Sequence, residues 1–266
     1  MLKGDSFELA GIQFDGIATG ATLTDIIKPS FAEICWDVTT GETFVHEDWL
    51  DRAPQIQIPF GNSYLIYYYV TKAWDDAAQD FTPDGVGVWA DMDGMKVEPT
   101  SESGVGFWLK SPKTGADGQP ATEGCSFTIC GQVPGGKTVE RSGTSFTLAA
   151  MPAPVNLALD DEKITWNLTS VKCWNDEGDD FDDPDWLTKT PQIQIPNGQG
   201  GYLIYYYVNR AWDDGAQDFT PAGVGVWADD GGMKISQTIP AGVGLWFLVP
   251  NAGEGKFGFS LADVTK

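Results

Sequence analysis

Apolar residues in this sequence fall in short runs, and glycine and proline recur in the segments between them. This spacing is typical of β-strands joined by turns, whereas a long amphipathic helix would place apolar residues every three or four positions. The pattern predicts at most one helical turn, over Ala73–Asp80. The strands that it predicts are Gln55–Ile58, Tyr64–Val70, Gly85–Ala90, Gly104–Leu109, Phe127–Cys130 and Phe257–Leu261.

Two of these strands are expected to have different surroundings. Gln55–Ile58 alternates polar and apolar residues between two prolines, which favours a short strand at the edge of a sheet. Tyr64–Val70 is a continuous run of β-prone residues, which favours a central strand covered on both faces.

The sequence contains a long internal repeat. Pro54–Pro59 recurs as Pro191–Pro196, and 27 of the 33 residues of Tyr64–Lys96 are identical in Tyr202–Lys234. All eight tyrosines and all tryptophans except Trp166 have a counterpart in the other copy. One large aromatic side chain buries about 150–250 Å², so we expect this shared set to build the core of each copy.

A segment rich in turn residues, Pro134–Lys137, separates the two copies. The sequence therefore predicts an all-β protein with two tandem homologous β-sandwich (jelly-roll-like) domains. The predicted domains span residues 1–133 and 143–266, and a short linker spans residues 134–142.

The charge of the chain excludes several classes of partner. Its 38 acidic and 16 basic residues give a formal net charge of −22. Such a surface repels phosphate backbones and anionic lipids, so we expect neither nucleic-acid binding nor binding to membrane surfaces. No apolar run approaches the roughly 20 residues that span a bilayer, so membrane insertion is not expected either. Residues Met1–Asp5 contain no apolar signal-peptide core, so we expect either a cytosolic protein or a mature form from which a leader has been removed.

The four cysteines, with a single histidine, exclude a zinc site of the Cys/His type, and they leave open one or two longer-range disulfides whose connectivity the sequence does not give. Cys35 and Cys173 occupy equivalent places in the two copies, each before a tryptophan, which is typical of small buried apolar residues. Cys125 and Cys130 lie five positions apart and would face opposite sides of one strand, so they are not expected to pair.

Candidate catalytic groups are few in kind. The chain has one histidine, His46, and no nucleophile elbow, phosphate-binding loop or dinucleotide fingerprint. Carboxylates are numerous, but their spacing does not single out an acid pair. The sequence therefore predicts a protein that is not an enzyme and has no cofactor other than a candidate calcium ion.

Calcium is the metal that the acidic residues favour, because it binds six to eight oxygen ligands on flexible loops. Two acidic segments provide candidates: Ala90–Gly94, which resembles the opening of a calcium loop, and Asp176–Asp185, the densest acidic cluster. The candidate ligands are Asp91, Asp93, Asp179, Asp180, Asp182 and Asp183.

Carbohydrate is a second candidate ligand, because tryptophan rings stack on sugars and carboxylates accept hydrogen bonds from hydroxyl groups. The candidate glycan contacts are Trp74, Asp75, Asp76, Trp212, Asp213 and Asp214. Two sites in one chain would also add avidity. Asn167, in Asn167-Leu168-Thr169, is a candidate glycosylation site.

The repeated segments Tyr64–Val70 and Gly104–Leu109, with their counterparts in the second copy, resemble modules of secreted surface proteins of environmental bacteria. The resemblance covers essentially the whole chain at the level of pattern. It implies an extracellular or cell-surface location and a role as a subunit of a filament or surface layer.

The sequence as a whole predicts a non-enzymatic structural protein whose partners are other copies of itself. Asp5–Gly11 and Phe257–Val264 are the strands expected to add to a neighbouring sheet. A tandem carbohydrate-binding protein, with glycans as partners, is the alternative.

Overall fold

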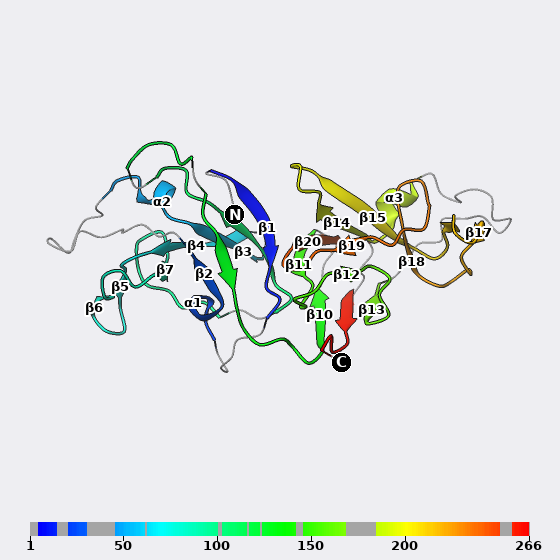
Figure 1. Ribbon diagram of the computed structural model, residues 1–266, viewed down its shortest axis with the longest axis horizontal. Coiled ribbons are helices and arrows are strands. Elements are labelled where there is room, and N and C mark those ends of the chain that lie inside the picture. Colours follow the sequence, from blue (N-terminus) through cyan, green and yellow to red (C-terminus); the bar gives the residue numbers. More distant parts are fainter. Residues whose placement is uncertain are drawn as a thin grey trace. The chain divides into compact units, whose positions relative to one another are not determined.

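The structure is a computed structural model that describes residues 5–14, 21–30, 46–61, 63–100, 103–115, 117–122, 124–141, 146–168, 185–250 and 257–265 (Figure 1). The chain divides into two compact units, Met1–Gln132 and Val133–Lys266. Each unit is described by itself below.

The first unit is built on a five-stranded sheet, in which the strand order is β1-β8-β3-β4-β7 and all pairings are antiparallel. Its strands are β1 (Phe7–Gly11), β3 (Gln55–Phe60), β4 (Ser63–Val70), β7 (Val88–Ala90) and β8 (Gly106–Lys110). The smaller elements are α1 (Leu23–Ile26), β2 (Ile27–Pro29), α2 (Trp49–Arg52), β5 (Trp74–Asp75), β6 (Asp80–Phe81) and β9 (Phe127–Ile129).

The core of the first unit lies between the five-stranded sheet and the layer formed by α1, β2 and β9. Ile56, Trp89 and Phe107 of the sheet are fully buried there against Leu23 and Ile27 of the other layer. A second, smaller cluster covers the opposite face of the sheet, where the ring of Trp49 from α2 meets the ring of Tyr68 at 5.2 Å.

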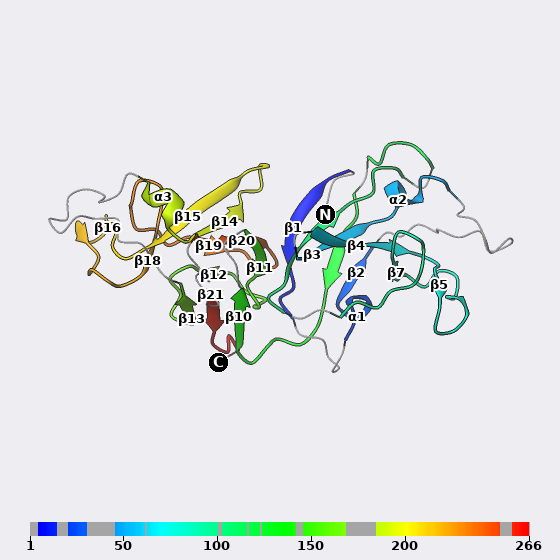
Figure 2. The ribbon, with the colours of Figure 1, turned by 180° about the vertical axis from the view of Figure 1, so that it is seen from behind.

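The second unit repeats the five-stranded sheet, with corresponding strands in the order β11-β20-β14-β15-β18 (Figures 1 and 2). These strands are β11 (Thr147–Ala150), β14 (Gln192–Pro196), β15 (Tyr202–Val208), β18 (Val226–Ala228) and β20 (Gly244–Leu248). A three-stranded sheet consists of β10 (Lys137–Arg141), β21 (Phe257–Leu261) and β13 (Ile164–Asn167). The remaining elements are β12 (Leu157–Ala158), α3 (Trp186–Lys189), β16 (Trp212–Asp213), β17 (Asp218–Phe219) and β19 (Thr238–Ile239).

Trp166 of β13, the tryptophan without a counterpart, belongs to the core of the second unit. Its ring lies 5.0 Å from that of Trp227 and 5.3 Å from that of Phe259, and its Nε1 donates a hydrogen bond to the carbonyl of Leu159. This residue therefore joins the five-stranded and three-stranded sheets of that unit.

The prediction of an all-β fold is confirmed, and each unit packs its five-stranded sheet on a smaller β layer in the manner of a β-sandwich. The predicted edge position of Gln55–Ile58 is wrong, because β3 lies between β8 and β4. Pairing of β3 with β8 ends at Gln57. Pro59 therefore lies beyond that ladder, so its missing N–H removes no hydrogen bond between β3 and β8.

Two predicted segments differ from the observed ones. Residues 137–141 of the predicted linker form β10, in which Val139 is buried against the core of the second unit. The predicted helical turn at Ala73–Asp80 is instead a small hairpin of β5 and β6. In the first case the turn residues Pro134-Gly135-Gly136 lie directly before the strand, and in the second case three aspartates lie in and around a pair of strands of two residues each. Such short strands beside turn residues give little signal of their own.

Cys125 and Cys130 flank β9 and do not pair with each other, as predicted. Burial raises the pKa of the Cys125 thiol to about 11, so this group is an unreactive part of the core. Cys35 and Cys173 lie outside the described residues.

Candidate functional site

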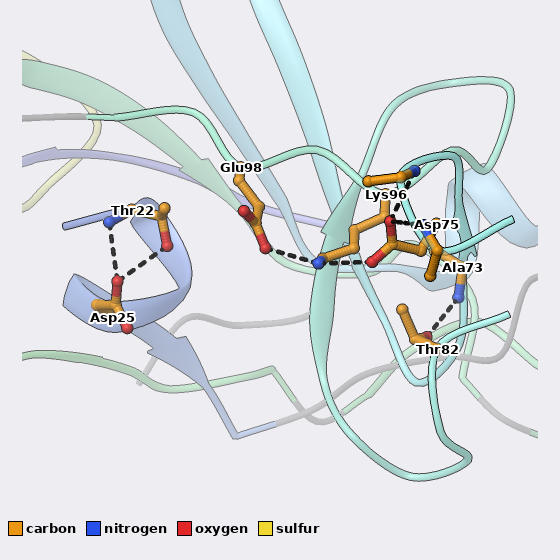
Figure 3. Close-up of polar contacts among 9 residues, drawn as sticks. Thr22, Asp25, Ala73, Asp75, Thr82, Lys96 and Glu98 are labelled. Carbon is orange, nitrogen blue, oxygen red and sulfur yellow. Dashed lines mark hydrogen bonds and ion pairs between the residues drawn. The ribbon is translucent and has the colours of Figure 1, made fainter. Parts of the chain in front are cut away.

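The predicted glycan contacts of the first unit lie in the β5–β6 hairpin. Asp75 accepts hydrogen bonds from the backbone N–H groups of Ala77 (3.1 Å) and Ala78 (3.2 Å). The other carboxylate oxygen of Asp75 lies 2.8 Å from Nζ of Lys96 (Figure 3). The same Nζ atom lies 2.6 Å from the carboxylate of Glu98. The hydrogen bond from Lys96, followed by those from the backbone, lowers the pKa of Asp75 below its usual range.

Trp74 and Asp76 also contact residues of this hairpin. The ring of Trp74 meets that of Phe81 edge-on at 5.1 Å, and its Nε1 lies 3.5 Å from the carboxylate of Asp76. Gln79, which has a left-handed backbone (φ 52°), donates a hydrogen bond to the Asp76 carbonyl at 2.7 Å. These contacts close the turn.

The second unit repeats this arrangement nearly atom for atom. Asp213 accepts from two backbone N–H groups and lies 2.7 Å from Nζ of Lys234. Trp212 meets Phe219 at 5.0 Å and lies 3.4 Å from Asp214. The structure therefore brings each predicted triplet together. It gives the indole N–H groups acceptors within their own hairpin, and it gives Asp75 and Asp213 backbone partners in that hairpin and a lysine partner outside it.

The calcium candidates Asp91 and Asp93 lie in the turn after β7. One oxygen of Asp91 accepts hydrogen bonds from the backbone N–H groups of Asp93 and Met95, both at 3.0 Å. Asp229 makes the same two bonds in the second unit, to Gly231 and Met233. Only the first aspartate is needed for this turn, which explains how glycine can replace Asp93 in the second copy.

Among the described residues, no group of three or more histidine, cysteine, aspartate or glutamate side chains is placed to hold a metal ion. The other calcium candidates, Asp179, Asp180, Asp182 and Asp183, lie outside the described residues. Asn167 is exposed on β13, where it pairs with Gly258 of β21.

Sequence reasoning missed a further surface, at the start of β4. Tyr64, Leu65 and Ile66 are 39%, 38% and 38% exposed, although their side chains alternate between the two faces of the sheet. β4 pairs with β7 only from Tyr68 onward. The predicted cover on both faces is therefore wrong for the first half of the strand, which extends past both clusters that cover its second half.

The start of β15 has the same properties in the second unit. Tyr202, Leu203 and Ile204 are 38%, 38% and 39% exposed, and pairing with β18 begins only at Tyr206. In Figure 1 the end of the hairpin formed by β14 and β15 projects beyond the other strands of its sheet. We call residues 64–66 and 202–204 the open strand ends.

Neither hairpin that carries an open strand end contains a charged residue. The uncharged stretches run from 53 to 71, between Arg52 and Lys72, and from 190 to 209, between Lys189 and Arg210. At the average of 20% charged residues for this chain, 19 residues would carry about four. Exposed edge strands are usually protected by a charge, most often a lysine. The absence of charge is the signal by which the sequence could have revealed this surface.

Other strand edges of the described structure are less suited to contact. β1 carries the exposed Glu8, and its last three residues are buried, as are the last three residues of β11. The predicted donor strand at the C-terminus contains β21, which is paired with β10 on one side and with β13 on the other, so both of its edges are occupied over Gly258–Leu261.

No protein-family model, curated protein or solved structure matches the chain. In the part of the chain that the structure describes, no helix has the length and apolar character needed to cross a membrane.

Proposed function

We propose that this chain is a non-enzymatic structural protein, a subunit of an extracellular filament or surface assembly built through contacts between β-domains. The observation that carries this proposal is the presence of the same uncharged, exposed strand end in both units. A subunit with two like contact surfaces can bind two neighbours, so repetition of the contact extends an assembly in one dimension.

The charge of the protein supports a contact at this place. Two chains of net charge −22 repel each other over most of their surfaces. The uncharged hairpins are where two copies approach with the least repulsion, and there they also bury apolar side chains. The extracellular setting rests on the resemblance of the repeated segments to modules of secreted surface proteins.

Carbohydrate binding has less support. A sugar site needs polar groups that are available to hydroxyls, whereas Asp75 and Asp213 are each engaged by a lysine and two backbone N–H groups. These contacts hold the two hairpins in place without a ligand.

Light scattering and negative-stain electron microscopy of the purified chain test the proposal. We expect the mean mass to rise with protein concentration and with ionic strength, because salt screens the repulsion between acidic surfaces. We expect elongated particles under the same conditions. A chain that stays monomeric at every concentration and ionic strength, with and without calcium, would refute the proposal.

A further inference from the structure

The backbone groups of the first open strand end have a defined direction. The N–H of Tyr69 donates to the carbonyl of Pro54 at 2.8 Å, so Tyr69 is a hydrogen-bonded position of the ladder between β3 and β4. Such positions alternate along an antiparallel pair. Tyr67 and Leu65 therefore bond to β3, whereas Tyr64 and Ile66 direct their N–H and C=O groups away from it.

The second unit has the same alternation. The N–H of Tyr207 donates to the carbonyl of Pro191 at 2.8 Å, which makes Leu203 a position bonded to β14. Tyr202 and Ile204 then direct their backbone groups outward, as Tyr64 and Ile66 do. No described residue pairs with these outward groups, because β7 and β18 reach only the later residues of β4 and β15.

We infer that the partner of each open strand end is an open strand end of a second copy of this chain, paired with it edge to edge and antiparallel. This inference rests on the proposed function and specifies its contact. In the pairing, Tyr64 faces Ile66 of the second copy and Ile66 faces Tyr64, so that four backbone hydrogen bonds form. Leu65 lies opposite Leu65 on the two-fold axis between the copies.

The choice of a second copy follows from three properties of this edge. Its two outward residues, one on either side of Leu65, make it complementary to itself under a two-fold rotation. It carries no charge in a chain of net charge −22, so like-charge repulsion is least there. Both units carry the sequence Tyr-Leu-Ile at this place, so either end of one chain fits either end of another.

Cysteine cross-linking of the full chain tests this geometry. In the proposed contact, Leu65 of one copy and Leu65 of the second copy form a non-hydrogen-bonded pair, in which the two Cα atoms are about 4.5 Å apart. A disulfide bridges Cα atoms that are about 4.4–6.8 Å apart. The variant Leu65→Cys should therefore form an intermolecular disulfide under mild oxidation, and peptide mapping distinguishes it from bonds of the four native cysteines. Leu203→Cys should behave in the same way.

Tyr64→Cys is the matched control, because Tyr64 lies on the same strand and is as exposed as Leu65. In the proposed register it faces Ile66 of the second copy, so its self-linked product should be at least about tenfold less abundant. A mixture of Tyr64→Cys and Ile66→Cys chains should instead cross-link to each other. Circular dichroism and melting temperature establish that each variant folds.

The outcomes separate this inference from the proposed function. Self-linking at Leu65 without self-linking at Tyr64 supports the antiparallel edge contact. Assemblies that form while folded Leu65→Cys and Leu203→Cys chains do not cross-link would overturn the edge contact and leave the proposed function standing. Equal self-linking at Leu65 and Tyr64 would overturn the antiparallel register, and a chain that never assembles would overturn both proposals.

Discussion

The ring of Tyr69 occupies the space next to Gly87, where a Cβ would lie 2.1 Å from the tyrosine hydroxyl oxygen. The same ring meets Trp89 edge-on at 5.2 Å, which holds it against the core of the first unit. Gly225 and Tyr207 have the same relation in the second unit, also at 2.1 Å. The second glycine of each Gly-Val-Gly-Val segment thus leaves room for the ring of a tyrosine from the neighbouring strand.

We expect Gly87→Ala to destabilise the protein by about 1–3 kcal/mol, because the added methyl group overpacks the contact with Tyr69. Gly135→Ala is the control, since a Cβ there meets nothing within 4 Å and the backbone has no left-handed φ. Urea denaturation of both variants measures the difference in the free energy of unfolding. Equal stability of the two variants would show that the tyrosine ring moves aside without cost.

The ion pair between Asp75 and Lys96 predicts a pH dependence of stability. The Lys96 hydrogen bond lowers the pKa of Asp75 in the folded protein. The resulting stabilisation is therefore fully present above the pKa of an unfolded aspartate, about 3.9, and is lost as the pH falls through the lower folded value. Asp75→Asn keeps an oxygen for the backbone N–H groups but removes this charge.

Asp75→Asn should therefore melt below the wild type at neutral pH, and the gap should close as the solution is acidified below the folded pKa. Asp93→Asn is the matched control, because its carboxylate is exposed and has no hydrogen bond or ion pair with any described residue. Thermal melts across the acidic range measure both gaps. A gap for Asp75→Asn that persists in acid would assign the effect to something other than its charge.

Two substitutions of Asp91 distinguish a structural role of this residue in its turn from a role as a metal ligand. Asp91→Ala removes the acceptor of two backbone hydrogen bonds, so we expect a loss of about 1–3 kcal/mol. Asp91→Asn retains an oxygen acceptor and should lose much less. A structural turn predicts that this order is the same with calcium and with chelator, and thermal melts in both solutions measure it. If calcium raises the melting temperature of the wild type but not that of Asp91→Asn, the residue is a ligand instead.

The fold class follows from the sequence because strand periodicity and turn residues are local signals. The division of Tyr64–Val70 into a covered half and an exposed half does not follow from them. All seven residues are β-prone, and exposure begins where β7 and the cluster around Trp49 end, which is set by segments far away in the chain. A continuous apolar run is therefore compatible with burial on both faces or with a contact surface.

The candidate site illustrates a second limit of sequence reasoning. Trp74, Asp75 and Asp76 have the residue types of a sugar site, and the structure does bring them together. Their partners Lys96 and Phe81 become visible only when the strands are placed. Residue types show what a side chain is able to bind, whereas the fold determines which of its groups are already bound.

Blocking one open strand end should change the length of the assembly rather than abolish it. Leu65→Lys places a charge on the first edge, and Leu203→Lys places one on the second. A lysine on an exposed strand edge opposes pairing with another strand. Each single variant keeps one open end, so we expect it to stop at dimers. The double variant has none and should remain monomeric.

Met92→Lys is the control, because Met92 is apolar and 65% exposed but lies in a turn outside both edges. Light scattering across protein concentration distinguishes these states, and single variants that still form long assemblies would show that growth does not depend on two strand ends per chain.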